Sequence, residues 1–205
     1  MTARPVRLLC IVASLFGAVA VTPGRSAELP DNQAQEDLWT GVLARFVDDS
    51  GRIDFAGLAA EPGDLGKIVA FVGAVSPASA PHRFPTQEAT LSYYINAYNA
   101  LAMHGVVASG SLDRFGLIGR MRFFVVRHFT VGGQRMSLYG LENDVIRPLG
   151  EERVHFALNC MVVGCPRLPR RAFRAAALDR QLEQAAQEFV NEARNVRVDA
   201  VSKTV

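Results

Sequence analysis

The chain has 205 residues, of which 49% are apolar and 20% are charged. This composition is typical of one ordinary folded domain and excludes a disordered, collagen-like or disulfide-dense chain. Its 22 basic and 20 acidic side chains leave a formal charge of only +2, so the charge balance predicts no nucleic-acid partner.

The N-terminal segment has the features of an export signal. Arg4 and Arg7 give it a positive start, and residues 8–21 form an uncharged apolar run that is too short for a comfortable membrane span. We therefore expect residues 1–27 to be a cleaved signal peptide and residues 28–205 to form a single domain. The prediction places this domain in the periplasm or outside the cell, with no stable membrane insertion after cleavage.

Apolar spacing predicts three helices in the first half of the domain. The third is the longest and carries apolar side chains on almost every face, which is typical of a buried central helix. A polar turn and a short alternating strand separate the first two. The predicted elements are helix 33–47, turn 48–51, strand 52–55, helix 65–75 and helix 86–107.

The second half mixes short strands with helices. Gly132 and Gly133 predict a two-residue hairpin turn, and Ser137 is a suitable cap for the helix that follows. The predicted elements are hairpin 128–136, helix 138–147, strand 154–158, helix 172–193 and strand 196–201. Because helices outnumber strands without regular alternation, we predict an α+β fold: a helix-rich single domain with a small antiparallel sheet and a buried central helix.

Several polar side chains lie on the predicted central helix. At about 100° per residue, Asn96, Asn99 and Met103 fall on one stripe, with His104 at its margin. Polar groups on a buried helix either satisfy one another and the backbone or line a site. The sequence leaves both interpretations open.

The densest chemistry follows in residues 153–166. Loss of the signal removes Cys10 and leaves Cys160 and Cys165 in an oxidising compartment. Cys160 falls where the predicted strand 154–158 gives way to a loop, a position at which a reactive group is both fixed and accessible.

Four stretches in this order resemble one known family, the domain of unknown function 547. They read GRIDFAGL, YYINAYNALAMHGVV, FTVGGQRMSLYGLENDVIRP and VHFALNCMVVGCPRLP. The resemblance implies a bacterial, often exported domain and supplies no activity. Two departures are expected to matter: Asn143 stands where members usually carry a histidine, and the chain stops at Val205, short of the aromatic-rich segment that usually follows the last strand.

Cys160 as a nucleophile is the first of three hypotheses for the cysteine region. Its base would be His104, His128 or His155, and Asn99 or Asn159 would orient that base or donate to an oxyanion. His104 is the preferred partner, because a strand at 154–158 would send His155 and Cys160 to opposite faces. Such a site would hydrolyse or transfer an acyl or amide group of a small-molecule or peptide substrate.

The second hypothesis is a structural Cys160–Cys165 disulfide in a non-catalytic periplasmic binding or scaffold domain. The third is a metal bound by Cys160, Cys165, His155 and His104, and the absence of paired C-x-x-C knuckles weighs against it. We therefore expect no metal and no cofactor.

A run of arginines follows the cysteines. Arg167, Arg170, Arg171 and Arg174 would bind an anionic substrate or would form a solvated basic surface. From the central helix and this run, Asn96 and Arg167 are the predicted substrate-binding residues.

Overall fold

The longest helix, α4 (Gln87–Ser109), runs through the middle of the protein and organises the other elements. A computed structural model describes residues 29–110, 119, 121–161 and 164–196. Thr86 begins α4 by accepting a hydrogen bond from the Ala89 amide, and Gly110, at φ 79°, ends it in the left-handed conformation that favours glycine. Residues on almost every face of α4 are buried, as predicted.

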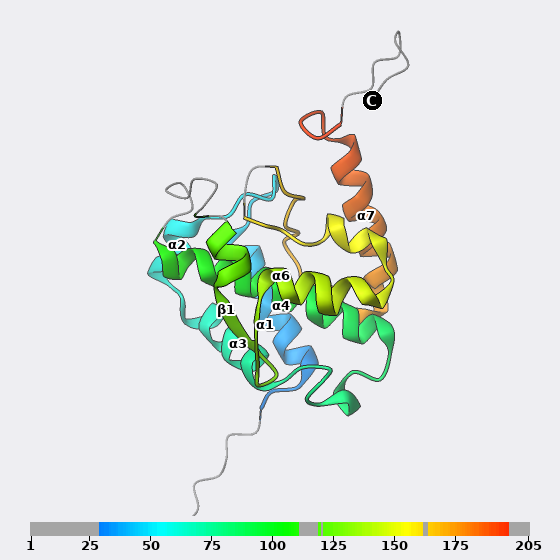
Figure 1. Ribbon diagram of the computed structural model, residues 1–205. Coiled ribbons are helices and arrows are strands. Elements are labelled where there is room, and N and C mark those ends of the chain that lie inside the picture. The colour runs from blue at the N-terminus through cyan, green and yellow to red at the C-terminus, as the bar shows by residue number, and fades with distance from the viewer. Residues whose placement is uncertain (1–28, 111–118, 120, 162–163, 197–205) are drawn as a thin grey trace, which may run out of the picture.

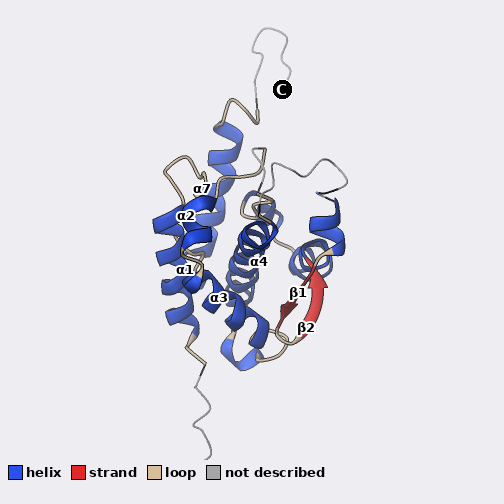
Figure 2. Ribbon diagram, turned by 90° about the vertical axis from the view of Figure 1, so that its left-hand side faces the viewer, coloured by secondary structure: helices blue, strands red, loops and turns tan. Residues whose placement is uncertain are grey.

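The remaining elements pack around α4 (Figures 1 and 2). The other helices are α1 (Asn32–Phe46), α2 (Phe55–Ala60), α3 (Gly63–Ala74), α6 (Leu138–Gly140) and α7 (Leu178–Asn191). Single 3-10 or π turns are η1 (Pro81–Arg83), η2 (Arg122–Val126), η3 (Leu141–Ile146), η4 (Arg147–Leu149), η5 (Glu152–Phe156) and η6 (Ala175–Ala177). Among the described residues, no helix is long and apolar enough to cross a membrane.

The sheet consists of one antiparallel hairpin, β1 (His128–Val131) and β2 (Gln134–Ser137), which pairs His128 with Ser137 and Val131 with Gln134. The predicted α+β class, with a small antiparallel sheet and a buried central helix, is therefore confirmed. Figure 2 shows α4 in the middle, with α1 and α7 on one side and the hairpin on the other.

Three predicted elements are wrong in detail. The predicted strand 154–158 begins instead in the 3-10 turn η5, which Ala157 ends by donating its N–H to Val154 O, and no described strand pairs with it. The predicted strand 52–55 makes only one bridge, between Ile53 and Val47, before Asp54 caps α2. The last helix begins at Leu178 rather than at 172, because side chains bind the backbone amides of residues 172–174: Thr40 of α1, Asn96 of α4 and Gln181 of α7 itself.

Three other predictions concern the helix after the hairpin and the two ends of the chain. The predicted helix 138–147 is a continuous helical stretch, but it changes from α6 to the wider π turn η3 and then to η4. Residues 197–201 of the predicted last strand lie outside the described residues, and so does the predicted signal peptide.

The hairpin turn has two left-handed glycines in different surroundings. Gly132 has φ 55° and Gly133 has φ 83°, the signs required by a tight two-residue turn. Their amides donate to Val72 O and Gly73 O, both at 2.8 Å, and so attach the hairpin to the end of α3. A Cβ atom at Gly132 would collide with Ser76, whereas a Cβ atom at Gly133 would meet open space.

We expect Gly132→Ala to destabilise the protein more than Gly133→Ala. In both variants a left-handed alanine lowers the free energy of unfolding by about 1–2 kcal/mol. Only Gly132→Ala loses about 1–3 kcal/mol more, because its methyl group overpacks against Ser76. Urea unfolding of both variants measures the difference. Equal losses would show that the contact between the turn and Ser76 does not restrict this position.

Candidate functional site

The centre of the site is the loop between the two cysteines. The sulfur atoms of Cys160 and Cys165 lie at disulfide distance, their Cα atoms are 5.8 Å apart, and Cys160 N donates to Cys165 Sγ at 3.2 Å. Cys165 is buried and Cys160 is partly exposed. Met161 adopts φ 59°, a left-handed conformation that is uncommon for a residue with a side chain.

Asn99 of α4 holds the segment that enters this loop. Its Nδ2 donates to Ala157 O, and its Oδ1 accepts a bond from Asn159 N, both at 2.9 Å. We call such a pair of bonds, in which one side-chain amide binds both an N–H and a C=O of a backbone segment, an amide clamp. Asn99 is only 1% exposed, so these bonds satisfy an amide that water does not reach.

Asn159 closes the loop itself. Its Nδ2 donates to Pro166 O at 2.7 Å, and its Oδ1 accepts from Met161 N at 2.6 Å. The two asparagines predicted to assist catalysis are thus both hydrogen-bonded to backbone: Asn99 binds the segment before Cys160, and Asn159 binds backbone within the loop and after Cys165.

Asn96, predicted to bind substrate, forms a second amide clamp. Its Oδ1 accepts from Phe173 N at 2.9 Å, and its Nδ2 donates to Phe173 O at 2.8 Å. Gln181 of α7 forms a third on the neighbouring residues, with Arg174 N and Ala172 O as partners. The sequence did not single out Gln181, since a glutamine on an amphipathic helix resembles many exposed ones.

None of the three candidate base histidines is hydrogen-bonded to a cysteine sulfur in the described part of the chain. His104 is half-buried near Arg127, and its Nδ1 is buried without a hydrogen-bond partner among the described residues. Burial lowers the pKa of the His104 imidazole below its usual value, and the charge of Arg127 lowers it further, so the ring is neutral at pH 7. His128 is exposed, with its Nδ1 at 2.7 Å from Val126 O.

His155 belongs to a different group of side chains. Its Nδ1 lies 3.9 Å from Glu142 Oε1, and the side chain is 45% exposed. Glu142 also binds Arg147 at 3.2 Å and accepts from the Tyr98 hydroxyl at 3.5 Å. Burial raises the pKa of the Tyr98 hydroxyl and the Glu142 charge adds to this, so the hydroxyl remains a donor. Because η5 is not a strand, the expectation that His155 and Cys160 leave opposite faces loses its basis.

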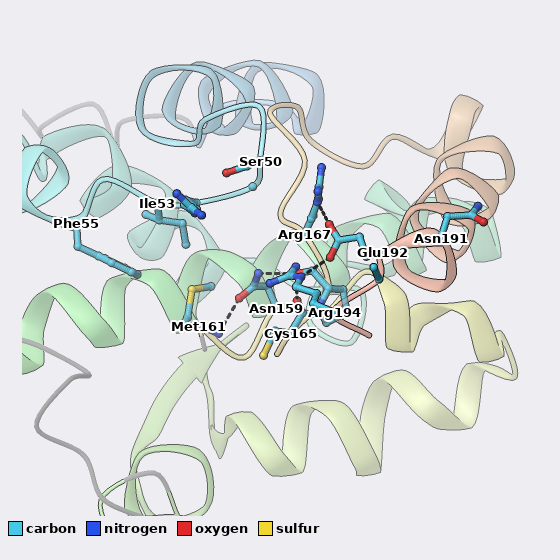
Figure 3. A pocket seen from close by; sticks show the side chains of 14 residues that line it. Ser50, Ile53, Phe55, Asn159, Met161, Cys165, Arg167, Asn191, Glu192 and Arg194 are labelled. Carbon is cyan, nitrogen blue, oxygen red and sulfur yellow. Dashed lines mark hydrogen bonds and ion pairs between the residues drawn. The ribbon is translucent and has the colours of Figure 1, made fainter. Parts of the chain in front are cut away.

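A pocket of about 620 Å³ opens beside the disulfide (Figure 3). Its walls come from three separate parts of the chain: the turn before α2, the end of the disulfide loop and the end of α7. The lining residues are Ser50, Gly51, Arg52, Ile53, Phe55, Asn159, Met161, Cys165, Pro166, Arg167, Asn191, Glu192, Ala193 and Arg194.

The charged wall of this pocket is built around Glu192. Its side chain is only 11% exposed and forms ion pairs with Arg167 and Arg194 (Figure 3). Arg194 Nη2 also lies 3.5 Å from Cys165 O. Arg52 adds a third guanidinium to the lining. Arg167, a predicted substrate-binding residue, therefore does face a cavity, with one acidic partner.

The other arginines of the predicted basic run lie outside this pocket and have partners elsewhere. Arg170 binds Asp49 and Ala44 O, and Arg171 binds Gln184 at 3.2 Å. Arg174 pairs with Asp37 and with Glu36. Their positive charges are largely matched by surface acceptors.

Comparison with known proteins identifies the family. The sequence profile described as "Protein of unknown function, DUF547" matches residues 82–190, which is more than half of the chain. The chain belongs to the DUF547 family. No curated protein and no solved structure matches it.

The DUF547 region contains α4, both cysteines and most of α7, whereas the pocket adds residues 50–55 and 191–194 from outside it. In the described part of this DUF547 chain, no three or more histidine, cysteine or acidic side chains cluster so as to hold a metal ion.

We expect Asn99→Leu to destabilise the protein by about 2–6 kcal/mol, because it leaves Asn159 N–H and Ala157 C=O buried without partners at about 1–3 kcal/mol each. Asn143→Ala is the matched control, since this amide bonds only Tyr139 O in its own turn at an exposed position, and we expect a loss of about 0.5 kcal/mol or less. Urea unfolding compares the two, and equal losses would mean that the Asn99 clamp does not support the disulfide loop.

Proposed function

We propose that this DUF547 chain is an exported, periplasmic or secreted domain that binds a small ligand without transforming it, and that its Cys160–Cys165 disulfide is structural. The observation that carries the proposal is the pairing of Cys160 with Cys165, which lines the pocket. A sulfur in a disulfide is not a thiolate and cannot attack a carbonyl. The hydrogen bonds of Asn99 and Asn159 to the backbone support the same conclusion.

The lining of the pocket suggests an amphipathic anion as its ligand. Ile53, Phe55 and Met161 offer an apolar surface, and Arg52, Arg167 and Arg194 outnumber the single lining carboxylate, Glu192. Guanidinium groups bind carboxylates through paired, charge-assisted hydrogen bonds. A carboxylate with a short apolar chain matches both features.

Calorimetric titration with octanoate tests this ligand class. We expect saturable binding of octanoate, weaker binding of 1-octanol, and at least a ten-fold loss of octanoate affinity in Arg167→Gln, since a hydrogen bond to a charged group contributes about 1.5–3 kcal/mol. Arg170→Gln is the matched control, because Arg170 binds Asp49 away from the pocket. Absence of octanoate binding, or equal binding of octanol, would contradict an anion site.

A thiol-dependent acyl or amide hydrolase or transferase is the second candidate. It is favoured by the left-handed backbone of Met161, directly after the more exposed cysteine, because strained backbone concentrates at active sites. In this candidate, a dithiol reductant exchanges with the disulfide, becomes oxidised to its own disulfide and leaves both cysteines as thiols. The Cys160 thiol gives its proton to a histidine, and the resulting thiolate attacks the acyl carbonyl to form a thioester, while the alcohol or amine leaves with that proton. Water or a second acceptor then takes the acyl group and restores the Cys160 thiol.

Alkylation followed by mass spectrometry separates the two candidates. For a structural disulfide we expect no iodoacetamide labelling of the purified protein before reduction, and slow labelling of both cysteines at pH 6 after reduction. We also expect the Cys160→Ser, Cys165→Ser double variant to lose roughly 2 kcal/mol of stability, as the chain-entropy model gives for so short a loop. Rapid labelling of Cys160 at pH 6 that is lost in His104→Ala would instead support the hydrolase.

A further inference from the structure

A second cavity, of about 450 Å³, lies between helices on residues that the disulfide pocket does not use. Helix α3 packs against both α1 and α4 (Figure 2). All three helices line the cavity, together with Phe84, Arg174, Ala175 and Ala176. Each helix contributes one stripe at helical spacing. The stripes are Asn32, Gln33, Gln35, Glu36 and Trp39 of α1; Ile68, Phe71 and Val72 of α3; and Ala89, Tyr93, Asn96 and Ala97 of α4. The cavity opens to solvent at the α1 end, where the lining residue Gln33 is exposed.

The body of the cavity is aromatic. Trp39, Phe71, Phe84 and Tyr93 line it, and the Phe84 and Tyr93 rings meet edge to face with centroids 4.9 Å apart. The Tyr93 hydroxyl donates to Val75 O, so the tyrosine presents its ring rather than an unmet donor. Small side chains on α4, Ala89 among them, leave the space between these rings open.

The polar groups of the cavity gather on α1 and beside it. Glu36 and Gln35 follow one another on α1, and Arg174 Nη1 lies 3.9 Å from Glu36 Oε2. The guanidinium of Arg174 is also bound by Asp37, outside the lining. Gln35 Oε1 is buried and accepts no hydrogen bond from the described residues. The Glu36 carboxylate, beside Arg174, and the Gln35 amide oxygen can each accept a further hydrogen bond.

We propose that this cavity binds a small amine with an aromatic body, its ring among Trp39, Phe71, Phe84 and Tyr93 and its ammonium group at Glu36. Ligand pockets of about 300–1,000 Å³ with apolar walls and a few polar groups are the usual small-molecule sites. An ammonium group supplies three donors, which is enough for the Glu36 carboxylate and for Gln35 Oε1. The terminal amide of Gln35 would have to rotate to bring this oxygen into the cavity. The inference is independent of the proposed anion pocket, which lies on other residues and takes a ligand of opposite charge.

The protein has a built-in reporter for this site, because Trp39 is its only tryptophan. The test titrates the mature protein with 2-phenylethylamine, 2-phenylethanol and phenylacetate while Trp39 emission is recorded. We expect a saturable change with the amine, at least a ten-fold weaker response to the alcohol and a weaker one still to the acid. No saturable change with the amine, or an equal response to phenylacetate, would overturn the proposal.

Two variants and one control locate the effect. Glu36→Gln removes the charge at the ammonium position, and we expect at least a ten-fold loss of amine affinity. Glu152→Gln is the matched control at an exposed position of η5, and we expect it to leave the affinity unchanged.

Ala89→Leu fills the cavity from α4, and we expect it to abolish the response while the circular dichroism spectrum and the melting temperature are retained. Equal losses in Glu36→Gln and Glu152→Gln, or unaltered binding in a folded Ala89→Leu, would contradict binding at this position.

Arg167→Gln keeps this inference separate from the proposed function. That variant alters the disulfide pocket and leaves the lining of the second cavity intact. We expect its response to 2-phenylethylamine to match that of the unmodified protein. A parallel loss of octanoate and amine binding in Arg167→Gln would assign both probes to the disulfide pocket and would overturn the second site.

Discussion

The structure depends on the burial of α4 with two asparagines on it. A helix buried on almost every face cannot leave side-chain amides without partners, because an unsatisfied buried polar group costs about 1–3 kcal/mol. Asn96 and Asn99 therefore bind backbone of segments far away in the sequence, around residues 173 and 157–159. These amide clamps perform the role that strand pairing performs in a sheet, since each supplies both a donor and an acceptor to the backbone of an irregular segment.

This arrangement explains how the second half of the protein is ordered with so little regular structure. The only described strands are those of the hairpin, and the described residues 141–161 and 164–177 consist of π turns, 3-10 turns and loops. Its backbone groups are satisfied instead by side chains of α4, by Gln181 of α7 and by Thr40 of α1. The disulfide adds a covalent constraint to the segment that Asn99 and Asn159 hold.

The two cavities follow from the same framework and differ in chemistry. The disulfide pocket forms where three irregular segments meet, and it combines an apolar wall with guanidinium groups around Glu192. The second cavity forms between three regular helices and combines aromatic rings with acceptors on α1. Burial raises the pKa of the Glu36 carboxyl above its usual value, although the charge of Arg174 opposes the shift. An ammonium group beside Glu36 would favour the charged carboxylate and so oppose the effect of burial.

The sequence by itself determined the features that repeat over short distances. Apolar periodicity located α1, α3 and α4, and the Gly132–Gly133 pair located the hairpin, because these depend on neighbours within a few residues. Four ordered motifs pointed to the family. Tertiary structure decided the conformation of residues 157–159 and 172–173, because their backbone partners lie as much as 132 positions away along the chain. It also brought Arg167 to Glu192 and Glu36 to Arg174, pairs that no local pattern predicts, since a side chain's partner depends on how the helices pack and not on its neighbours in sequence.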